Sequence, residues 1–128
     1  MENKMILVDT TILIDFFRKT DKSNSRSIHL VDEGYQFFIS AITAYEIFSG
    51  STTVQMNFWN EFLLRIKIYS VESSTVKNAV LINQQLKKKR KQIDIADFFI
   101  AATAFTLKLP LATLNKKHFE RVENLTII

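Results

Sequence analysis

The chain has 128 residues, of which 47% are apolar, and it carries a formal net charge of +4. This length and apolar content suit one domain with its own core, and the presence of only two glycines and one proline excludes collagen-like and low-complexity chains. The chain has no cysteine, no apolar stretch that could span a membrane and no signal peptide pattern, so we expect a single cytoplasmic domain over residues 1–128.

Strand and helix patterns alternate along the chain. The first strand, residues 5–8, is continuously apolar, which is typical of a strand covered on both faces of a parallel sheet. In chain order we expect a strand at 5–8, a helix at 10–17 capped by Thr10 or Thr11, a helix at 27–34, a strand at 35–40, helices at 41–50 and 54–66, a strand at 67–71, a helix from 73 into the basic run 87–91, a helix at 95–109, a strand at 110–113, helical turns at 116–122 and a strand at 125–128. This order predicts an α/β fold, a three-layer α/β/α sandwich with a central, mainly parallel five-stranded sheet.

Acidic and amide side chains follow the ends of the expected strands. Asp9 comes directly after the first strand, Glu46 lies six residues past the second, and Asn115 follows the fourth. Asp94 and Asp97 stand one helical turn apart at the start of the helix that leads into the fourth strand. Since ligand sites in open parallel sheets form at the carboxyl ends of the strands, we expect these side chains to meet in one crevice.

Each of these residues, taken singly, also has a structural explanation. Thr43 and Glu46 have the spacing of a capping box, so Glu46 could simply cap its own helix. Asp94 and Asp97 are favoured near a helix N-terminus by the helix dipole, and an asparagine after a strand is most often a turn residue. Asp9 is the hardest to explain in this way, because an apolar strand gains nothing from ending in a carboxylate.

Together, the carboxylates predict a metal site. Several ionised carboxylates in one small pocket repel each other strongly. A hard divalent cation such as Mg²⁺ or Mn²⁺ removes that conflict, because it prefers oxygen ligands and keeps several waters. Such a cation can also lower the pKa of a bound water and neutralise charge on a phosphodiester.

Three stretches of the chain resemble the motifs of a known family. They are "ILVDTTILID" near the start, "ISAITAYEIFSG" in the first third and "IDIADFFIAATAF…LPLATLNKKHFERV" near the end. With these stretches the chain resembles PIN domains and, among them, the VapC-type toxin ribonucleases of VapBC toxin–antitoxin pairs. The resemblance extends over essentially the whole chain, which implies a single PIN domain over residues 1–128 and a PIN-like fold.

The resemblance implies an endoribonuclease that depends on Mg²⁺ or Mn²⁺. Asp9, Glu46 and Asp97 match the acidic triad of the family. Asp9 and Asp97 would hold the principal metal, and Glu46 would bind it through water or orient the nucleophile. The implied reaction is in-line attack of a metal-activated water on an RNA phosphodiester, which leaves 5′-phosphate and 3′-hydroxyl ends.

The resemblance also implies a second tier of site residues and two protein partners. Asn115 matches a fourth position that is acidic in many members, and Asp94 matches a position that is acidic in some. Thr10 and Thr113 match hydroxyl positions that could orient waters or a phosphate, whereas Asp15 matches a position of structural support. Toxins of this family usually form homodimers and are silenced by a cognate antitoxin.

Two basic segments are candidates for binding the RNA backbone, since phosphate contacts give affinity that does not depend on sequence. Cations are also favoured at a helix C-terminus, so the first segment could be a solvated helix end. We expect His118 to cap or pack at a helix start and His29 to lie on a helix surface. The candidate RNA-binding residues are Lys87, Lys88, Lys89, Arg90, Lys91, Lys116 and Lys117.

Other functional classes fit the sequence less well. Phosphatases of the haloacid-dehalogenase type need an Asp where this chain has Thr11, and receiver domains need an Asp at the end of the third strand. The serious alternative is a catalytically impaired PIN-fold module that binds RNA or protein. Cleavage of structured DNA also stays open.

Overall fold

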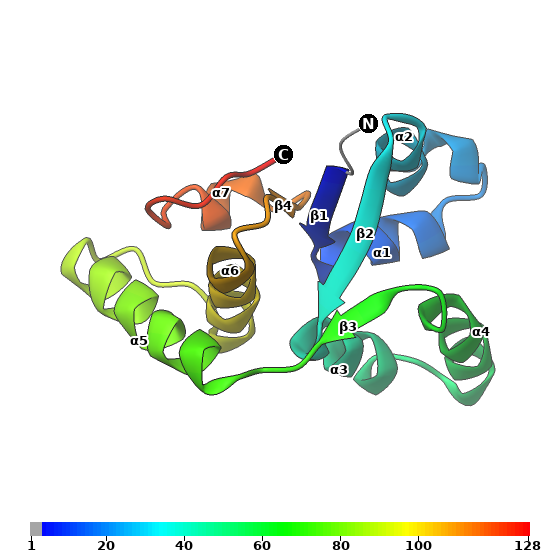
Figure 1. Cartoon of the computed structure of the whole chain (residues 1–128). Helices are drawn as coiled ribbons and strands as arrows, with labels where there is room; N and C mark the ends of the chain where they lie inside the picture. Colours follow the sequence, from blue (N-terminus) through cyan, green and yellow to red (C-terminus); the bar gives the residue numbers. More distant parts are fainter. Residues whose placement is uncertain (1–3) are drawn as a thin grey trace.

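A parallel sheet of four strands lies at the centre of the structure, a computed structural model that describes residues 4–128 (Figure 1). The strands stand in the order β3-β2-β1-β4, and every neighbouring pair is parallel. Their bounds are β1 Lys4–Val8, β2 Tyr35–Ser40, β3 Lys67–Tyr69 and β4 Leu111–Ala112. The parallel sheet predicted from the alternation of elements is therefore confirmed, although with four strands in place of five.

Helices cover both faces of this sheet. In Figure 1, α5, α6 and α7 lie on one side of the strands, and α1, α2 and α4 lie on the other. The helices are α1 Thr10–Arg18, α2 Arg26–Asp32, α3 Ala41–Ser49, α4 Thr53–Leu63, α5 Ser73–Lys88, α6 Ile95–Leu107 and α7 Lys116–Phe119, with a 3₁₀ turn η1 at Lys22–Asn24. The predicted three-layer α/β/α sandwich is confirmed.

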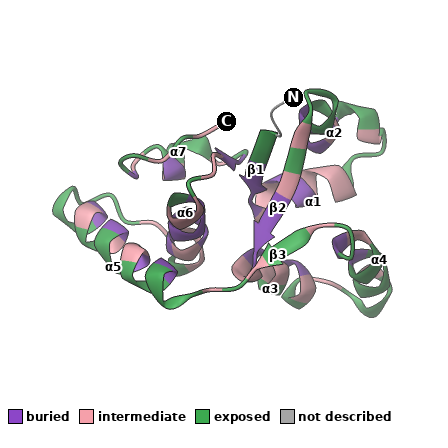
Figure 2. Ribbon diagram, in the orientation of Figure 1, coloured by how far each residue is buried: buried purple, intermediate pink, exposed green. Residues whose placement is uncertain are grey.

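Two buried clusters hold the layers together. Ile6 and Val8 of β1 belong to one cluster, with Trp59 of α4, whereas Leu7 belongs to the other, with Ile100 of α6. The alternation follows from the strand, in which successive side chains point to opposite faces. Figure 2 shows that burial is greatest toward the carboxyl ends of β1 and β2, where the last three residues of each strand are buried.

The fifth predicted strand, residues 125–128, is wrong as a strand. This segment forms only an isolated parallel bridge between Leu111 and Ile127. The Leu111 N–H donates to the Thr126 carbonyl at 2.8 Å, and the Ile128 N–H donates to the Leu111 carbonyl at 2.8 Å. The strand it pairs with, β4, has only two residues, and of these only Leu111 faces the segment, because the Ala112 carbonyl accepts the Asp9 N–H instead.

Several predicted element ends also differ from the structure. The third strand ends at Tyr69 and not at residue 71, and the helical turns after Asn115 end at Phe119 and not at residue 122. The helix predicted at 54–66 spans Thr53–Leu63, and the helix predicted at 95–109 ends at Leu107, before the left-handed residue Lys108. Helix and strand ends depend on caps and local turns, which periodicity does not encode.

Small residues let α6 lie close to its neighbours. Ala101, Ala102 and Ala104 are fully buried in the cluster that α5, α6 and the sheet share. The Asn78 side chain of α5 donates to the Thr106 hydroxyl of α6 at 2.8 Å, which ties the start of α5 to the end of α6. The two helices are therefore antiparallel, and the basic end of α5 lies near the start of α6.

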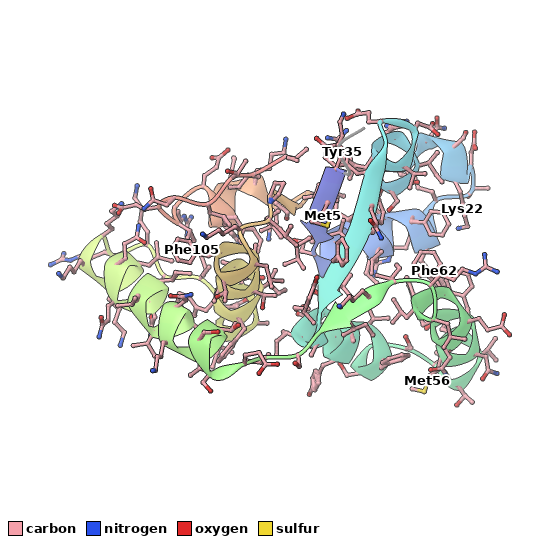
Figure 3. The ribbon with its side chains drawn as sticks, viewed as in Figure 1. Met5, Lys22, Tyr35, Met56, Phe62 and Phe105 are labelled. Carbon is pink, nitrogen blue, oxygen red and sulfur yellow. The ribbon has the colours of Figure 1, made fainter. Side chains whose placement is uncertain are left out.

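Aromatic side chains fill the opposite layer. Phe16 of α1 lies with its ring centroid 5.4 Å from that of Phe62 on α4, and the Lys22 ammonium lies 4.9 Å from the Phe16 ring (Phe62 and Lys22 are labelled in Figure 3). The same ammonium donates to the Phe16 carbonyl at 2.9 Å and the Phe17 carbonyl at 3.1 Å, so it caps the end of α1.

Across residues 4–128, no helix is long and apolar enough to cross a membrane.

The buried alanines of α6 generate a stability prediction. We expect Ala101→Leu to lower the free energy of unfolding by about 1–3 kcal/mol, because extra methylenes in a filled core force side chains and backbone apart. Urea denaturation of the variant measures the change. Val80→Leu, at a half-exposed position of α5, is the control and should unfold like the unmodified chain. Equal stability of all three proteins would contradict the close packing of α6.

Candidate active site

Asp9 is the first residue after β1, and its side chain is buried, with 2% exposure. It forms the N-cap of α1, where its Oδ1 accepts the Ile12 backbone N–H at 3.3 Å. The prediction that Thr10 or Thr11 caps this helix is therefore wrong. A carboxylate at this position satisfies a free backbone donor and faces the positive end of the helix, so part of the cost of its burial is offset locally.

Two threonine hydroxyls hold the Asp9 carboxylate. The Thr11 hydroxyl donates to Oδ1 at 2.5 Å, and the Thr113 hydroxyl donates to Oδ2 at 2.5 Å. Each hydroxyl oxygen in turn accepts a backbone N–H, from Leu114 at 3.0 Å and from Asn115 at 2.9 Å. Because a backbone N–H can only donate, each hydroxyl proton is directed at Asp9, and the arrangement favours the ionised carboxylate.

The register of the sheet explains how Thr113 reaches Asp9. Val8 pairs with Ala112 in the parallel ladder, so the residues that follow them leave the sheet side by side. The Asp9 N–H donates to the Ala112 carbonyl at 3.1 Å, which continues this pairing. Burial nevertheless raises the pKa of Asp9 above its ordinary value, against the lowering effect of the Thr11 and Thr113 hydroxyls.

Glu46 lies on α3 and accepts the Thr10 hydroxyl at 2.6 Å. The alternative explanation of Glu46 as part of a capping box is wrong. The N-cap of α3 is Ser40, whose hydroxyl accepts the Thr43 N–H at 3.1 Å, so Thr43 lies inside the helix and Glu46 lies one turn further on. The Glu46 carboxylate is thus directed toward α1, not toward its own helix terminus.

Asp97 lies in the first turn of α6 and brings the acidic residues together. Burial raises the pKa of Asp97, and the negative charges of Asp9, Glu46 and Asp94 raise it further, while His118 lowers it. The charges of Asp9, Glu46 and Asp94 thus each act on Asp97. Asp94 is the exposed N-cap residue of α6 and makes no side-chain cap hydrogen bond. That these side chains line one crevice at the carboxyl ends of the strands stays a prediction.

His118 and Asn115 form a pair beside Asp97. The Asn115 amide lies 2.9 Å from His118 Nδ1, and the same nitrogen lies 3.7 Å from Asp97 Oδ2. The contact of Thr11 with Asp9 was not predicted from the sequence, and for His118 the sequence predicted only capping or packing at a helix start. The signals that could have indicated these roles are the i, i+2 spacing of Asp9 and Thr11 and the i, i+3 spacing of Asn115 and His118.

The donor set at this edge of the sheet fits a hard divalent cation, because it consists of carboxylate and hydroxyl oxygens. Within residues 4–128, no group of three acidic or histidine side chains is arranged to ligate one ion together. Mg²⁺ does not require such a group, since it commonly binds through one or two carboxylates and keeps several waters. Asp9 and Asp97 supply two carboxylates from separate elements, which is enough for binding of this kind.

The candidate RNA-binding segment 87–91 is exposed at the end of α5. The Lys89 ammonium lies 2.7 Å from the Glu123 carboxylate, and Arg121 donates to the Gln92 carbonyl at 3.3 Å. These contacts fix the segment against the turn after α7. Lys116 and Lys117 begin α7, directly after Asn115. Contact of these basic residues with RNA stays a prediction.

The sequence matches a known family over nearly its whole length. Residues 6–125 match the model of the PIN domain family. Ribonuclease VapC1 of Methanocaldococcus jannaschii is 40% identical over 123 residues, which cover 95% of this chain and 84% of that protein. Ribonuclease VapC of Rickettsia bellii is 29% identical over 133 residues, which cover 96% of this chain and 94% of that protein.

Solved structures show the same fold. VapBC2 from Rickettsia felis, bound to promoter DNA, includes a chain that superposes with a TM-score of 0.84 at 23% identity, over 97% of both chains. A toxin–antitoxin complex from Klebsiella pneumoniae gives a TM-score of 0.74 at 28% identity, over 96% of this chain and 95% of that one.

The repulsion at Asp97 predicts a stability gain on its removal. We expect Asp97→Asn to raise the melting temperature by a few degrees at pH 7.5 in EDTA, because the folded state holds this carboxylate with a raised pKa. An acid with a raised folded pKa destabilises the fold increasingly as pH rises above its unfolded value, about 3.9 for Asp. The gain should therefore vanish below about pH 4.

Differential scanning fluorimetry across this pH range measures the effect. Asp32→Asn, at an exposed position at the end of α2, removes the same charge away from the crevice and is the control. A melting temperature of Asp97→Asn equal to or below that of the unmodified chain at pH 7.5 would show that Asp97 is not under charge repulsion.

Proposed function

The chain belongs to the PIN domain family, and from this premise we propose that it is a metal-dependent endoribonuclease, the toxin of a toxin–antitoxin pair that acts on RNA in the cytoplasm. The observation that carries the proposal is that the adjacent Thr10 and Thr11 hydroxyls donate to Glu46 and to Asp9, which brings two acidic side chains from separate elements to the start of α1. The charges of both also act on Asp97. The relative from Methanocaldococcus jannaschii, a ribonuclease similar over nearly the whole chain, supports the same activity.

Asp9 and Asp97 are the residues that we propose to hold Mg²⁺ or Mn²⁺, with Glu46 acting through a water or orienting the nucleophile. When bound, the cation supplies positive charge that offsets the carboxylates and stabilises charge that develops on a phosphodiester. Thr11 and Thr113 hold both Asp9 oxygens in place, and their hydrogen bonds lower the pKa of Asp9 against the larger raising effect of burial. The Thr10 hydroxyl donates to one oxygen of Glu46 and holds it in place, so the chain arranges these two acids before any ligand arrives.

The proposed reaction is hydrolysis of an RNA phosphodiester by in-line attack of water, which leaves 5′-phosphate and 3′-hydroxyl ends. Asn115, at the fourth position of the acidic set, engages His118 through its amide. Its contribution to the reaction is therefore to orient His118 next to Asp97 and not to add charge. Asp94, exposed at the start of α6, adds negative charge at the rim of the crevice.

The partners that we propose follow from the relatives. Solved structures with this fold include VapBC complexes and a toxin–antitoxin complex, so we propose that a cognate antitoxin binds this chain, and that the toxin itself forms a homodimer. The neutral amide at Asn115 favours one alternative, a PIN-fold module that binds RNA or protein without cutting it.

The first test of the proposed function is RNA cleavage. We expect the purified chain to cut a mixed RNA pool in Mg²⁺ or Mn²⁺, and Asp9→Asn to lower the rate by about 100-fold or more, because outer-shell changes alone cost about 10–100-fold at metal sites. Gel analysis of labelled RNA measures the rate, with EDTA and Asp32→Asn as controls. RNA binding without cleavage under all conditions would favour the binding module.

The second test is metal binding. We expect Mn²⁺ to raise the melting temperature of the unmodified chain, since a ligand that binds only the folded state stabilises it, by about 2.7 kcal/mol at 100 times its Kd. Asp9→Asn should abolish most of this rise. An equal rise in both proteins would remove Asp9 from the metal site, whatever the outcome of the cleavage assay.

A further inference from the structure

A cleft of about 490 Å³ opens beside the acidic residues, along helix α1. Thr10 and Thr11 line one end of it, Arg18 and Lys19 line the other, and Leu114 lines it from the loop after β4. Ile14 and Asp15 of α1 line it between the two ends, where the Asp15 carboxylate lies 3.6 Å from the Lys19 ammonium. Its volume lies within the range of about 300–1,000 Å³ that small-ligand sites occupy. The cleft can therefore hold a group of the size of a nucleotide.

The end of this cleft that Thr10 and Thr11 line, its inner end, lies next to the candidate active site. The Thr10 hydroxyl that lines it donates to Glu46 at 2.6 Å, and the Thr11 hydroxyl donates to Asp9 at 2.5 Å. Only one hydroxyl group thus separates the cleft from each of two carboxylates of the acidic set. If one phosphate of a polymer with a phosphate backbone lies at Asp9 and Glu46, the adjacent residue of that polymer would lie in this cleft.

Arg18 gives the outer end of the cleft a free positive charge. Arg18 follows Thr11 by seven residues, two helical turns, so both lie on one face of α1 about 10 Å apart along its axis. Among residues 4–128, no hydrogen bond or ion pair engages the exposed Arg18 side chain, whereas Lys19 lies 3.6 Å from Asp15. The helix dipole favours a positive charge in the last turn of α1. The dipole does not explain why the Arg18 side chain lines a cleft.

Leu114 adds a fixed apolar surface between these two ends. Its side chain is 52% exposed, while its backbone N–H is held by the Thr11 hydroxyl at 3.0 Å. The leucine is therefore exposed without being free to move away from the acids. An unpaired nucleotide offers matching chemistry, since it joins the flat face of a base to a negatively charged phosphate.

We propose that this cleft binds the nucleotide next to the scissile phosphate of an RNA strand, with its base against Leu114 and its outer phosphate on Arg18. The inference rests on the proposed ribonuclease function and specifies the path of the substrate away from the acids.

The salt dependence of RNA binding tests this inference. Each phosphate contact of a single strand contributes about −0.7 to the slope of log K against log salt concentration. We expect Arg18→Gln to weaken binding several-fold and to reduce the magnitude of this slope by about 0.7. Arg18→Lys, which keeps the charge, should retain the slope, and Leu114→Ala should weaken binding at an unchanged slope.

The measurement is fluorescence anisotropy of a labelled, mixed-sequence single-stranded RNA pool in EDTA. All proteins carry Asp97→Asn, which removes one repelling charge and, with EDTA, prevents cleavage. Arg65→Gln is the matched control, because it removes the same charge from an exposed position that lines a separate cleft at α2 and α4. It should leave the slope unchanged.

Equal slopes for Arg18→Gln and the unsubstituted arginine, or no RNA binding at all, would overturn the inference. An acidic peptide is the rival occupant of the cleft. If Arg18→Gln weakens binding of poly-glutamate and leaves RNA binding unchanged, the cleft is a peptide site and the inference is wrong. Failure of the unmodified chain to cleave RNA in Mg²⁺ would contradict the proposed function and would not alter the binding result.

Discussion

The carboxyl group of Asp9, buried at the end of β1, is the constraint on which the rest of the site depends. A buried charge is tolerated only where hydrogen bonds or an opposite charge compensate for the lost hydration. Here the compensation comes from the first turn of α1 and from Thr113, which lies 104 residues away in the sequence. The same bonds fix the relative positions of α1 and the loop after β4, so the fold and the site share one set of interactions.

Hydrogen bonds from neutral groups do not remove the repulsion between the carboxylates. Burial and the charges of Asp9, Glu46 and Asp94 all raise the pKa of Asp97, and only His118 acts in the opposite direction. The chain thus places carboxylates together whose repulsion its own side chains do not remove, as is common at functional sites. If the proposed cation binds there, the same carboxylates lower the stability of the free chain and hold the ligand.

The sequence alone was sufficient for the parallel sheet and its flanking helices, and for the place of Asp9 at the end of β1 and of Asp97 at the start of α6, because strand ends and helix starts fix which residues lie at an edge. It was not sufficient for the role of Asp9 as a helix cap, since Thr10 and Thr11 are equally good caps by residue type. It also did not indicate the place of His118 against Asp97, which depends on how α7 lies against α6. The predicted fifth strand failed because β4 has only two residues, of which only one faces the segment.

Carbon-detected NMR titration of the Asp9 and Asp97 carboxylates, with and without Mg²⁺, tests most directly whether these acids form one cation site. In the metal-free chain the pKa of each should lie above the ordinary Asp value, from burial at Asp9 and from burial and repulsion at Asp97. Added Mg²⁺ should lower both pKa values together, because a cation favours the ionised forms. Two titrations that Mg²⁺ leaves unchanged would contradict a shared metal site and leave the acids as structural charges.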